Sequence, residues 1–489
     1  MESTRKIIID PVTRIEGHLK IELEVEEGKV TQAKSSGTLF RGIEHMLTGR
    51  DPRDAIVITQ RICGVCPIIH GLTAARLLEN TVQQTIPSNA RRIRNIVAGV
   101  NLLQSHILHF YLLTLFDYVH APQISPLSVE QEDVNRFSQS DTEMFIEHYK
   151  QALTIRQKAH EIIAIWGGRM PVPSGLVFGG ITGKITSEKI ASSLSLLVEI
   201  ADFITTIYYP DVIKILQTYP DFSSMGTGYA NYLAFGGYNL DDTGSSQLLP
   251  RGVVIQGTVE DFKPEDITEH IKHSYYKHDA AYYPPAKGST IPEHDKQGAY
   301  SWSKSPRYKN LAVEVGPLAR IIIAYHKGAK EIVQSVNESL RQANMEVSSL
   351  SSVSGRHLSR AIESKLFTGL IPNWVNELEP EKPVYTLMKV PDEGESESLA
   401  EAPRGAIGHW AQFKNGKIIN YQIMSPTTWN ASPADSNNIP GPLEKALQGT
   451  PVKNESNPIE ALRIVRSFDP CLACAVHTLK TRKKYVPVA

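Results

Sequence analysis

Two stretches carry all four cysteines of this 489-residue chain: Arg61-Ile62-Cys63-Gly64-Val65-Cys66-Pro67-Ile68-Ile69-His70 and Asp469-Pro470-Cys471-Leu472-Ala473-Cys474-Ala475-Val476-His477. Each stretch has two cysteines three positions apart, followed by a histidine. On one helical turn this spacing places both sulfurs on the same side. If the two ends of the chain meet, we expect four thiolates to converge, and four soft thiolates favour a metal site.

Other interpretations of the cysteines stay open from spacing alone. A structural zinc with an all-cysteine shell usually ties a small local loop, whereas most of the chain separates these pairs. A chain of this length can bury a core without such a tie. Local C-x-x-C disulfides are mostly redox-active and lie near a βαβ pattern, which flanks neither pair. Four unrelated buried cysteines would repeat the same spacing only by chance.

Composition indicates an ordinary globular protein, with 41% hydrophobic and 21% charged residues. The net charge of -1 gives no electrostatic basis for binding nucleic acid or an anionic membrane. Met1 to Lys6 lead straight into a strand-like Ile7-Ile8-Ile9 without the apolar core of a signal peptide. No stretch is predicted to be long and apolar enough to span a bilayer. The chain by itself is therefore expected to be soluble and cytosolic, although a partner could supply an export signal or an anchor.

Periodicity predicts a mainly helical α+β protein that forms one domain. Alternating apolar residues predict a hairpin over Lys6–Val30, and short apolar runs predict strands at Gly252–Gly257 and Lys417–Tyr421. Ser88 and Asn89 are expected to cap a long helix that reaches Phe110. Further helices are predicted at Asp141–Trp166, Ser187–Tyr219, much of Leu311–Leu370, Leu443–Gln448 and Pro458–Ser467. The organisation expected is a β-rich segment (1–60), a helical core (61–219), a β-containing insertion (220–310), a mixed C-terminal part (311–477) and a tail (478–489).

The motifs R-x-C-G-x-C-x-x-x-H and D-P-C-x-x-C-x-x-H resemble the paired signatures of the nickel-iron hydrogenase large subunit. The resemblance extends along nearly the whole chain, through Asp10–His18, Glu314–Arg320, Glu401–Ala406 and Tyr421–Asn430. The first and last of these blocks look closer to the membrane-associated uptake branch. The resemblance implies a long helix-bundle core with small N-terminal and peripheral antiparallel β elements, a fold related to complex I. It also implies reversible oxidation of H2 to protons and electrons.

The resemblance implies that nickel takes all four thiolates. Cys66 and Cys474 would bridge to an iron that carries CO and two cyanides, and Cys63 and Cys471 would bind nickel alone. Cleavage of H2 needs a metal that takes the hydride and a base that takes the proton. Cys471 is the implied first proton acceptor, and it passes the proton to Glu16. A partly buried carboxylate suits such a relay, although from the residues alone Glu16 could be an exposed turn residue.

Other site residues are implied in the same way. Arg404 would hold a permanently charged guanidinium over the open position, although an arginine in a loop could instead pair with a surface carboxylate. Thr427 would donate a hydrogen bond to a cyanide. The remaining neighbours implied are His70, Pro403, Pro426 and Asp469. For the block Glu314–Arg320 we expect only packing and turn geometry.

A second metal, magnesium or a similar divalent ion, is implied near the C-terminus. Its ligands would be the carboxylate of Glu44, the backbone carbonyl of Ile423 and the imidazole of His477, and the carboxylate and carbonyl oxygens suit a hard cation. Glu44 could otherwise be a solvated helix residue. The resemblance also implies a maturation endopeptidase that cuts between His477 and Thr478 and removes the tail 478–489.

Two positions depart from the family pattern. Ser105 stands where many members have Asp, so no charge pairing with Arg404 is expected there. Val172 stands where a histidine is common, and that loop is given no role.

The chain has no cysteines left for an iron-sulfur cluster, so we expect an iron-sulfur small subunit as partner in a heterodimer. A membrane cytochrome or another acceptor would follow it. Export on the partner's twin-arginine signal would place the enzyme on the periplasmic face of the cytoplasmic membrane, with a cytoplasmic location as the alternative. Two other functions stay open: a complex I-like quinone-site subunit, whose relatives generally lack the cysteine quartet, and a non-catalytic scaffold with structural zinc.

Overall fold

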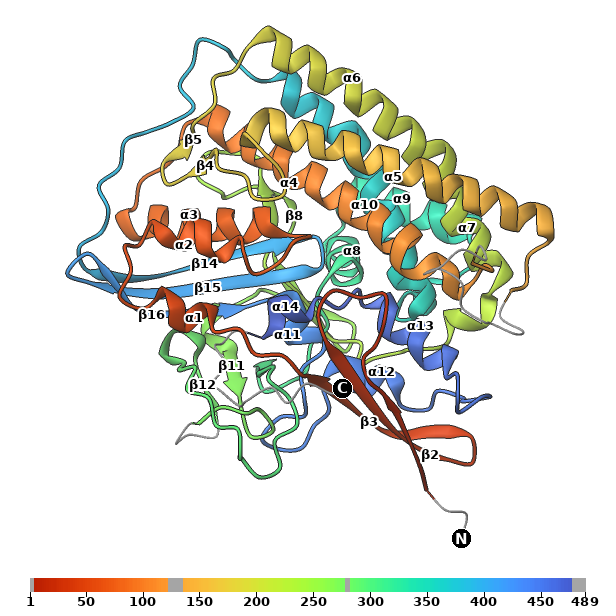
Figure 1. Ribbon diagram of the computed structural model, residues 1–489. Coiled ribbons are helices and arrows are strands. Elements are labelled where there is room, and N and C mark those ends of the chain that lie inside the picture. The colour runs from red at the N-terminus through yellow and green to blue at the C-terminus, as the bar shows by residue number, and fades with distance from the viewer. Residues whose placement is uncertain (1–3, 122–134, 278–281, 477–489) are drawn as a thin grey trace, which may run out of the picture.

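A layer of long helices forms one side of the molecule, and the β1–β3 and β14–β16 sheets and the short C-terminal helices lie beneath it (Figure 1). The structure is a computed structural model that describes residues 4–121, 135–277 and 282–476. The layer contains α3 (Pro67–Val82), α4 (Ser88–Leu108), α5 (Gln139–Gly167), α6 (Ser187–Phe203), α7 (Tyr209–Thr218), α8 (Pro317–His326), α9 (Lys330–Gln342) and α10 (Val353–Asn376). The predicted mainly helical α+β fold is confirmed.

Helix α4 is the centre of this layer, because it packs against both α5 and α10. Its apolar residues recur at helical spacing and are buried, among them Ile93, Ile96, Val97, Val100 and Leu103. The helix continues as a π-helix, η1 (His109–Thr114), and a 3-10 turn, η2 (Leu115–Asp117).

The capping prediction for α4 was wrong. Pro87 occupies the N-cap and makes no side-chain cap, while the hydroxyl of Ser88, already inside the helix, donates to Asp242 at 2.5 Å.

Two helical stretches among the described residues are long and apolar enough to cross a membrane by length and composition, which corrects the expectation that no stretch would be. In Ser88–Asp117 the most apolar window is 89% buried inside the molecule, as in a core helix. In Ser187–Thr218, which joins α6, η3 (Ile204–Tyr208) and α7, that share is 28%.

The N-terminal hairpin forms a three-stranded antiparallel sheet of β1 (Arg5–Ile9), β2 (Leu19–Glu26) and β3 (Lys29–Gly37). The alternation of β2 buries Leu19, Ile21, Leu23 and Val25 on one face, as the sequence predicted. The loop 10–18 between β1 and β2 reaches back to the second cysteine motif. Two short helices follow the sheet, α1 (Ile43–Leu47) and α2 (Asp54–Thr59).

A second antiparallel sheet positions the middle of the site. It consists of β14 (Gly394–Ala402), β15 (Gly405–Lys414) and β16 (Lys417–Met424), and α3 packs on β14 and β15. Ala402 pairs with Gly405, and Gly408 pairs with Met424. The tight turn at Pro403 and Arg404 therefore lies at the same end of the sheet as the exit of β16 into α11 (Pro426–Asn430).

Residues 220–310 hold short strands in small sheets, which share a core with the C-terminal part. Leu233, Val253 and Ile267 cluster with Trp410 and Met424. The strands are β6 (Tyr232–Ala234), β7 (Gly237–Asn239), β8 (Gln247–Leu249), β9 (Gly252–Ile255), β10 (Thr258–Glu260), β11 (Ile267–His270), β12 (Tyr282–Tyr283) and β13 (Ser305–Tyr308). The remaining elements are β4 (Leu176–Val177), β5 (Gly180–Ile181), α12 (Pro442–Leu447), α13 (Ile459–Ser467), α14 (Leu472–Ala475) and the 3-10 turns η4 (Pro220–Ser223), η5 (Pro264–Asp266), η6 (Pro285–Lys287) and η7 (Val347–Leu350).

Candidate metal centre

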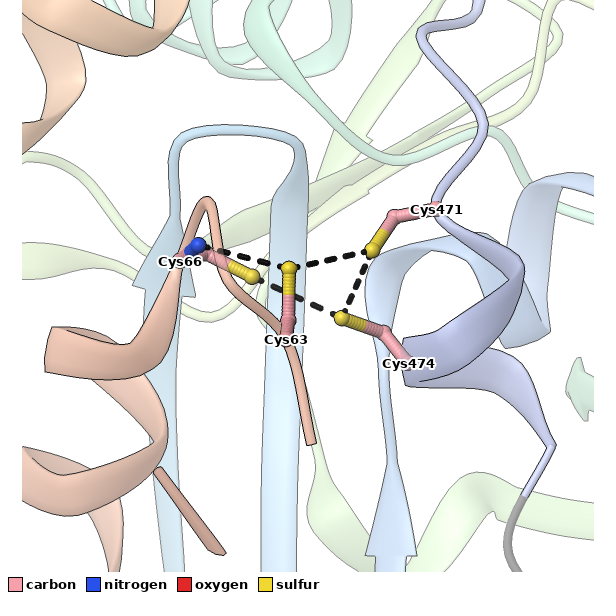
Figure 2. Close-up of side chains that lie close together, drawn as sticks. All are labelled: Cys63, Cys66, Cys471 and Cys474. Atoms are coloured by element: carbon pink, nitrogen blue, oxygen red, sulfur yellow. Dashed lines mark hydrogen bonds between the residues drawn. The ribbon is translucent and has the colours of Figure 1, made fainter. Parts of the chain in front are cut away.

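The two cysteine motifs meet in space, and their four sulfurs face one another (Figure 2). All four Sγ atoms lie within 4.8 Å of one another, and all four residues are buried. Cys63 Sγ lies 3.3 Å from Cys471 Sγ, and Cys66 Sγ lies 3.5 Å from Cys474 Sγ. The shortest pair, Cys471 and Cys474, is 2.9 Å apart, well beyond a disulfide bond. The interpretation as two local disulfides is therefore wrong, and the prediction of a joint site is confirmed.

Each motif lies at the start of a helix rather than along one helical turn, which corrects the local geometry expected from the spacing. Cys66 is the N-cap of α3, and Cys63 lies in the preceding bend. The backbone N–H groups of Val65 and Cys66 donate to Cys63 Sγ at 3.2 and 3.4 Å. Cys471 is the N-cap of α14. Backbone amides thus favour a thiolate at Cys63.

The electrostatics of the four thiols fit a bound cation. Hydrogen bonds from the other thiols, Cys471 first, hold the pKa of Cys63 well below its ordinary value. Burial raises the pKa of Cys471 and of Cys474. Four thiols in so small a buried space cannot all ionise without a positive charge among them. A soft metal ion supplies that charge, and the donor set fits it.

Glu16 joins the centre from the loop between β1 and β2. Cys471 Sγ donates to Glu16 Oε2 at 3.0 Å, and the N–H of Ala473 donates to the same oxygen at 3.2 Å. The backbones also pair, because Leu472 N–H donates to Glu16 O at 2.8 Å. Burial raises the pKa of Glu16 above its ordinary value. Next to it, Gly17 has a φ of +85°, and a Cβ there would lie 2.7 Å from Ala473 N.

Arg404 lies at the turn between β14 and β15, with its guanidinium held by the second motif. Its Nε donates to Asp469 O at 3.0 Å, and its Nη2 donates to Asp469 Oδ1 at 2.9 Å. Nη1 is buried and has no hydrogen-bond partner among the described residues. Burial alone would lower the pKa of Arg404, but Asp469 and the thiols outweigh it and raise the pKa. A permanent cation therefore stands beside the thiolates with one nitrogen still available.

Thr427 and Pro426 lie in the first turn of α11, where Ser425 caps the helix. Thr427 Oγ1 accepts the N–H of Cys471 at 2.9 Å, so its own hydroxyl proton stays available as a donor. Pro403 directly precedes Arg404. The structure thus brings Thr427 and Arg404 into contact with the second motif.

His70 begins a buried chain of hydrogen bonds that the sequence did not predict. Its Nδ1 lies 3.3 Å from His409 Nε2, and His409 Nδ1 lies 2.8 Å from the hydroxyl of Tyr421. His409 and Tyr421 come from neighbouring strands, β15 and β16. No motif marked either residue, and only the pairing of these strands brings them together.

Glu44 and Ile423 also meet, although they come from α1 and β16. The N–H of Ile423 donates to Glu44 Oε1 at 2.7 Å, and the hydroxyl of Thr290 donates to Glu44 Oε2. Nearby, Lys304 Nζ donates to Gln422 Oε1 at 2.7 Å and lies 3.3 Å from Glu269 Oε2. No motif in the sequence marked Thr290 or Glu269. His477 and Thr478 lie outside the described residues.

Ser105 lies in the buried face of α4. Its hydroxyl has no hydrogen-bond partner among the described residues.

Comparison with known proteins places this geometry in a family. The profile described as nickel-dependent hydrogenase matches residues 41–143 and 131–477, and a HoxL-like profile matches residues 6–36. The chain is 40% identical to the periplasmic NiFeSe hydrogenase large subunit of Desulfomicrobium baculatum, over 97% of this chain and 95% of the relative. It is 33% identical to the hydrogenase-2 large chain of Escherichia coli K12 (97% and 98%) and 34% identical to the uptake hydrogenase large subunit of Rhizobium leguminosarum (98% and 96%).

Solved structures agree with the sequence relatives. A reduced, active form of the Ni-Fe-Se hydrogenase from Desulfomicrobium baculatum superposes with a TM-score of 0.91 at 40% identity, covering 97% of this chain and 100% of that one. The reduced Ni-Fe-Se hydrogenase from D. vulgaris Hildenborough gives the same TM-score at 39% identity, with the same coverage. The names of these relatives include selenium, whereas this chain has cysteine at all four positions of the cluster.

Proposed function

Because this chain belongs to the nickel-dependent hydrogenase family as a large subunit, an H2-oxidising enzyme with a nickel-iron site held by four cysteines, we propose a role for each thiolate. Cys63 and Cys471 would hold nickel alone, and Cys66 and Cys474 would hold both nickel and iron. The observation that carries this proposal is the convergence of four buried thiols from opposite ends of the chain. Cys63 Sγ lies 3.3 Å from Cys471 Sγ and Cys66 Sγ lies 3.5 Å from Cys474 Sγ, so each cysteine of the first motif contacts one of the second.

The chain supplies the path for the proton. The bound metals supply Lewis-acid and redox chemistry, which polarises H2 and takes up its two electrons. The Cys471 thiolate accepts the proton and passes it to Glu16, whose carboxylate oxygen lies 3.0 Å from the sulfur. This distance is within hydrogen-bond reach, as proton transfer requires. Glu16 is partly exposed on this chain, so the proton leaves from there.

Arg404 acts as a fixed electrostatic donor. Asp469 holds two of its nitrogens, and the buried Nη1 has no hydrogen-bond partner among the described residues, so it stays available as a donor. A preorganised cation in a dry site is worth far more than one in water, because it does not have to reorient during the reaction. Pro403, Pro426 and Thr427 complete the wall around an iron that carries CO and two cyanides, with the Thr427 hydroxyl as donor. His70 supports the bridging thiolates from α3.

A divalent ion, magnesium or similar, occupies the second site in this proposal. Glu44 and the carbonyl of Ile423 are two of its ligands, and the hydrogen bond between these residues supports the pairing. His477 supplies a third ligand after an endopeptidase has cut between His477 and Thr478. Carboxylate and carbonyl oxygens are the ligands that such hard cations prefer.

The electrons leave through a small subunit that carries iron-sulfur clusters, since all four cysteines of this chain serve the metal centre. Gly64 lies between two of these cysteines and is exposed, and Arg61 beside it is exposed as well. Along the chain, this exposed surface is the nearest one to the cysteines of the metal centre, so electrons have the shortest path to a partner there. We propose that the small subunit docks at this surface. A membrane cytochrome or another acceptor follows on the periplasmic side, in line with the name of the Desulfomicrobium baculatum relative, a periplasmic hydrogenase.

Elemental analysis and infrared spectroscopy of the purified complex test the proposal. We expect nickel and iron in equal amounts and the stretching bands of CO and cyanide. One zinc per chain without nickel or iron would instead support a structural scaffold. A complex with neither metal that binds quinone would support the complex I-like alternative.

A further inference from the structure

Arg320 makes a fully paired ionic cluster next to the turn that carries Arg404. It lies in the first turn of α8, and its side chain is completely buried. Nε and Nη2 donate to the two carboxylate oxygens of Glu363 at 2.7 and 2.8 Å, and Nη1 donates to Glu401 Oε2 at 2.9 Å. Glu363 comes from α10 and Glu401 from β14, so one guanidinium joins three elements.

The two remaining N–H groups of Arg320 bind the backbone just before Arg404. Nη1 donates to the carbonyl of Ala402 at 2.8 Å, and Nη2 donates to the carbonyl of Pro403 at 3.0 Å. All five N–H donors of the guanidinium are thus used. Two of them fix the peptide groups on which the position of Arg404 depends.

The backbones of α8 and of the Arg404 turn also touch. Gly316, just before α8, has a φ of +124°, and a Cβ there would lie 2.8 Å from Arg404 O. Gly405 has a φ of +128°, and a Cβ there would lie 2.5 Å from Gly316 N. Only glycine allows such an approach at these dihedral angles. The block Glu314–Arg320 therefore does more than pack. The backbone of Gly316 contacts the turn, and the side chain of Arg320 donates hydrogen bonds to it.

We propose that Arg320 is a positioning residue for Arg404, an inference that rests on the proposed role of Arg404 at the metal centre. Arg320 fixes the backbone of the turn through hydrogen bonds to the carbonyls of Ala402 and Pro403, while Asp469 fixes the guanidinium of Arg404. With both ends fixed, Nη1 of Arg404 keeps one direction. The alternative role for Arg320 is fold stability alone, through the charges of Glu363 and Glu401.

Arg320→Lys separates these roles. Lysine keeps the positive charge between the two glutamates, but its compact ammonium has three donors and cannot reproduce the planar fork. The carbonyls of Ala402 and Pro403 lose their donors, and the turn can shift. A displacement of about 1 Å at a catalytic group costs on the order of a hundredfold in rate. We therefore expect a large fall in kcat for H2 oxidation with little change in KM.

The chain offers a matched control in Arg94. It is equally buried, and Nη1 and Nη2 donate to the two oxygens of Glu79, both at 2.7 Å. Nη2 also donates to the carbonyls of Val177 and Gly180 at 2.8 and 3.2 Å. Arg94→Lys thus makes the same chemical change where the gripped backbone belongs to β4 and β5. It should lower stability to a similar degree and leave kcat unchanged.

The test compares both variants with the unmodified enzyme as complexes of equal nickel, iron and partner content. Infrared bands of the diatomic ligands report the position of Arg404 independently of turnover. We expect shifted or broadened bands and a lower kcat in Arg320→Lys, with neither change in Arg94→Lys. Identical bands and kcat in the two variants would overturn the positioning role. Missing nickel and missing bands in the unmodified complex would refute the proposed function instead.

If Arg320→Lys does not assemble, Glu401→Gln tests whether Arg320 positions Arg404. Glu401 Oε1 accepts the N–H of Phe235 at 2.7 Å while Oε2 accepts Arg320 Nη1. Glutamine has one oxygen for these two donors, so the anchor of Arg320 weakens while the arginine itself remains. We expect the same band change to a smaller degree. Unchanged bands in an assembled Glu401→Gln complex would overturn the proposal.

Discussion

Glu16 and Cys471 share a single short contact, and the proposed route of the proton depends on it. The carboxylate oxygen that faces the sulfur also accepts the N–H of Ala473. Glutamine has the same shape and can keep the backbone contact through its amide oxygen, but it cannot take up a proton at neutral pH. Geometry and acid-base chemistry can therefore be separated at this residue.

Glu16→Gln is expected to keep its metals and to lose proton transfer. We expect H2 oxidation and the exchange of H2 with D2O to fall by about 10²- to 10⁴-fold, the range that a general base contributes. Conversion of para- to ortho-hydrogen should persist, because cleavage and recombination at the centre do not require the proton to leave. Glu26→Gln, in the exposed end of β2, is the control. Full exchange activity in Glu16→Gln would remove Glu16 from the route.

Glu444 carries a prediction about pH and stability. It is buried and accepts the N–H groups of Ser35 and Gly441 and the hydroxyl of Tyr300. Burial raises its pKa from 4.5 to about 7. The folded chain then holds this proton more tightly than the unfolded chain. The stabilisation from Glu444 is complete below pH 4.5 and is lost as the pH rises through about 7.

We therefore expect the Tm of the unmodified complex to fall relative to the Tm of Glu444→Gln between about pH 5 and pH 7.5. Glu269 and Glu401, whose pKa values burial also raises to about 7, keep part of the slope in that variant. The measurement is calorimetry across this pH range. An unchanged slope in Glu444→Gln would show that Glu444 is ionised in the folded chain.

The contact between Glu16 and Cys471 depends on the loop between β1 and β2, because the backbone of this loop packs against the backbone of the second motif. Gly17 makes this possible through a positive φ and the lack of a Cβ. Gly28 offers a comparison, since it has a similar φ of +71°, and a Cβ there would meet nothing within 4 Å. Both glycines have a positive φ, but only at Gly17 would a Cβ clash with a neighbouring residue.

Gly17→Ala is expected to separate Glu16 from Cys471. Both Gly17→Ala and Gly28→Ala introduce the strain of a positive φ, roughly 1–2 kcal/mol of unfolding free energy. Gly17→Ala adds the clash with Ala473, so it should be the less stable variant and should lose most of its H2 oxidation. Gly28→Ala should keep full activity. Calorimetry and a dye-reduction assay on both complexes measure the difference, and equal activity would contradict the loop's proposed role.

Sequence predicted the elements and residues that carry their own pattern. The spacing of apolar residues predicted helices such as α5. The same C-x-x-C spacing in two motifs predicted the site of four cysteines. Arg404 and Thr427 were predicted only through the resemblance, since a single arginine or threonine in a loop has no periodicity. His409 was missed and Arg320 was expected only to pack, because the role of each residue becomes visible only when separate elements pack together. The cap of α4 was missed because Pro87 could begin the helix without a side-chain bond.

The full chain leaves one edge of its metal centre at the surface. Gly64 has no positive φ, and a Cβ there would meet nothing within 4 Å. The fold of this chain therefore tolerates a large side chain at Gly64, whereas a docked partner would not. Gly369 in α10 is equally open and exposed, and it provides the control.

Gly64→Trp should fold normally and assemble poorly with the small subunit. We expect weaker co-purification and, in any complex that forms, slower reduction of acceptors that draw electrons through the partner. Gly369→Trp should assemble as the unmodified chain does. Size-exclusion chromatography with subunit quantification is the measurement. Normal assembly of Gly64→Trp would place the docking surface elsewhere.

The pairing of sulfurs from opposite ends of the chain also sets an order of events in the cell. Cys63 leaves the ribosome 408 residues before Cys471, which at about 5–20 residues per second is roughly 20 to 80 seconds. Until Cys471 and Cys474 have been synthesised, the first two thiols have no companions, and loading of the metals cannot be completed. An early arrest of translation would therefore release a polypeptide with half of its ligands, open to oxidation or to capture of the wrong ion.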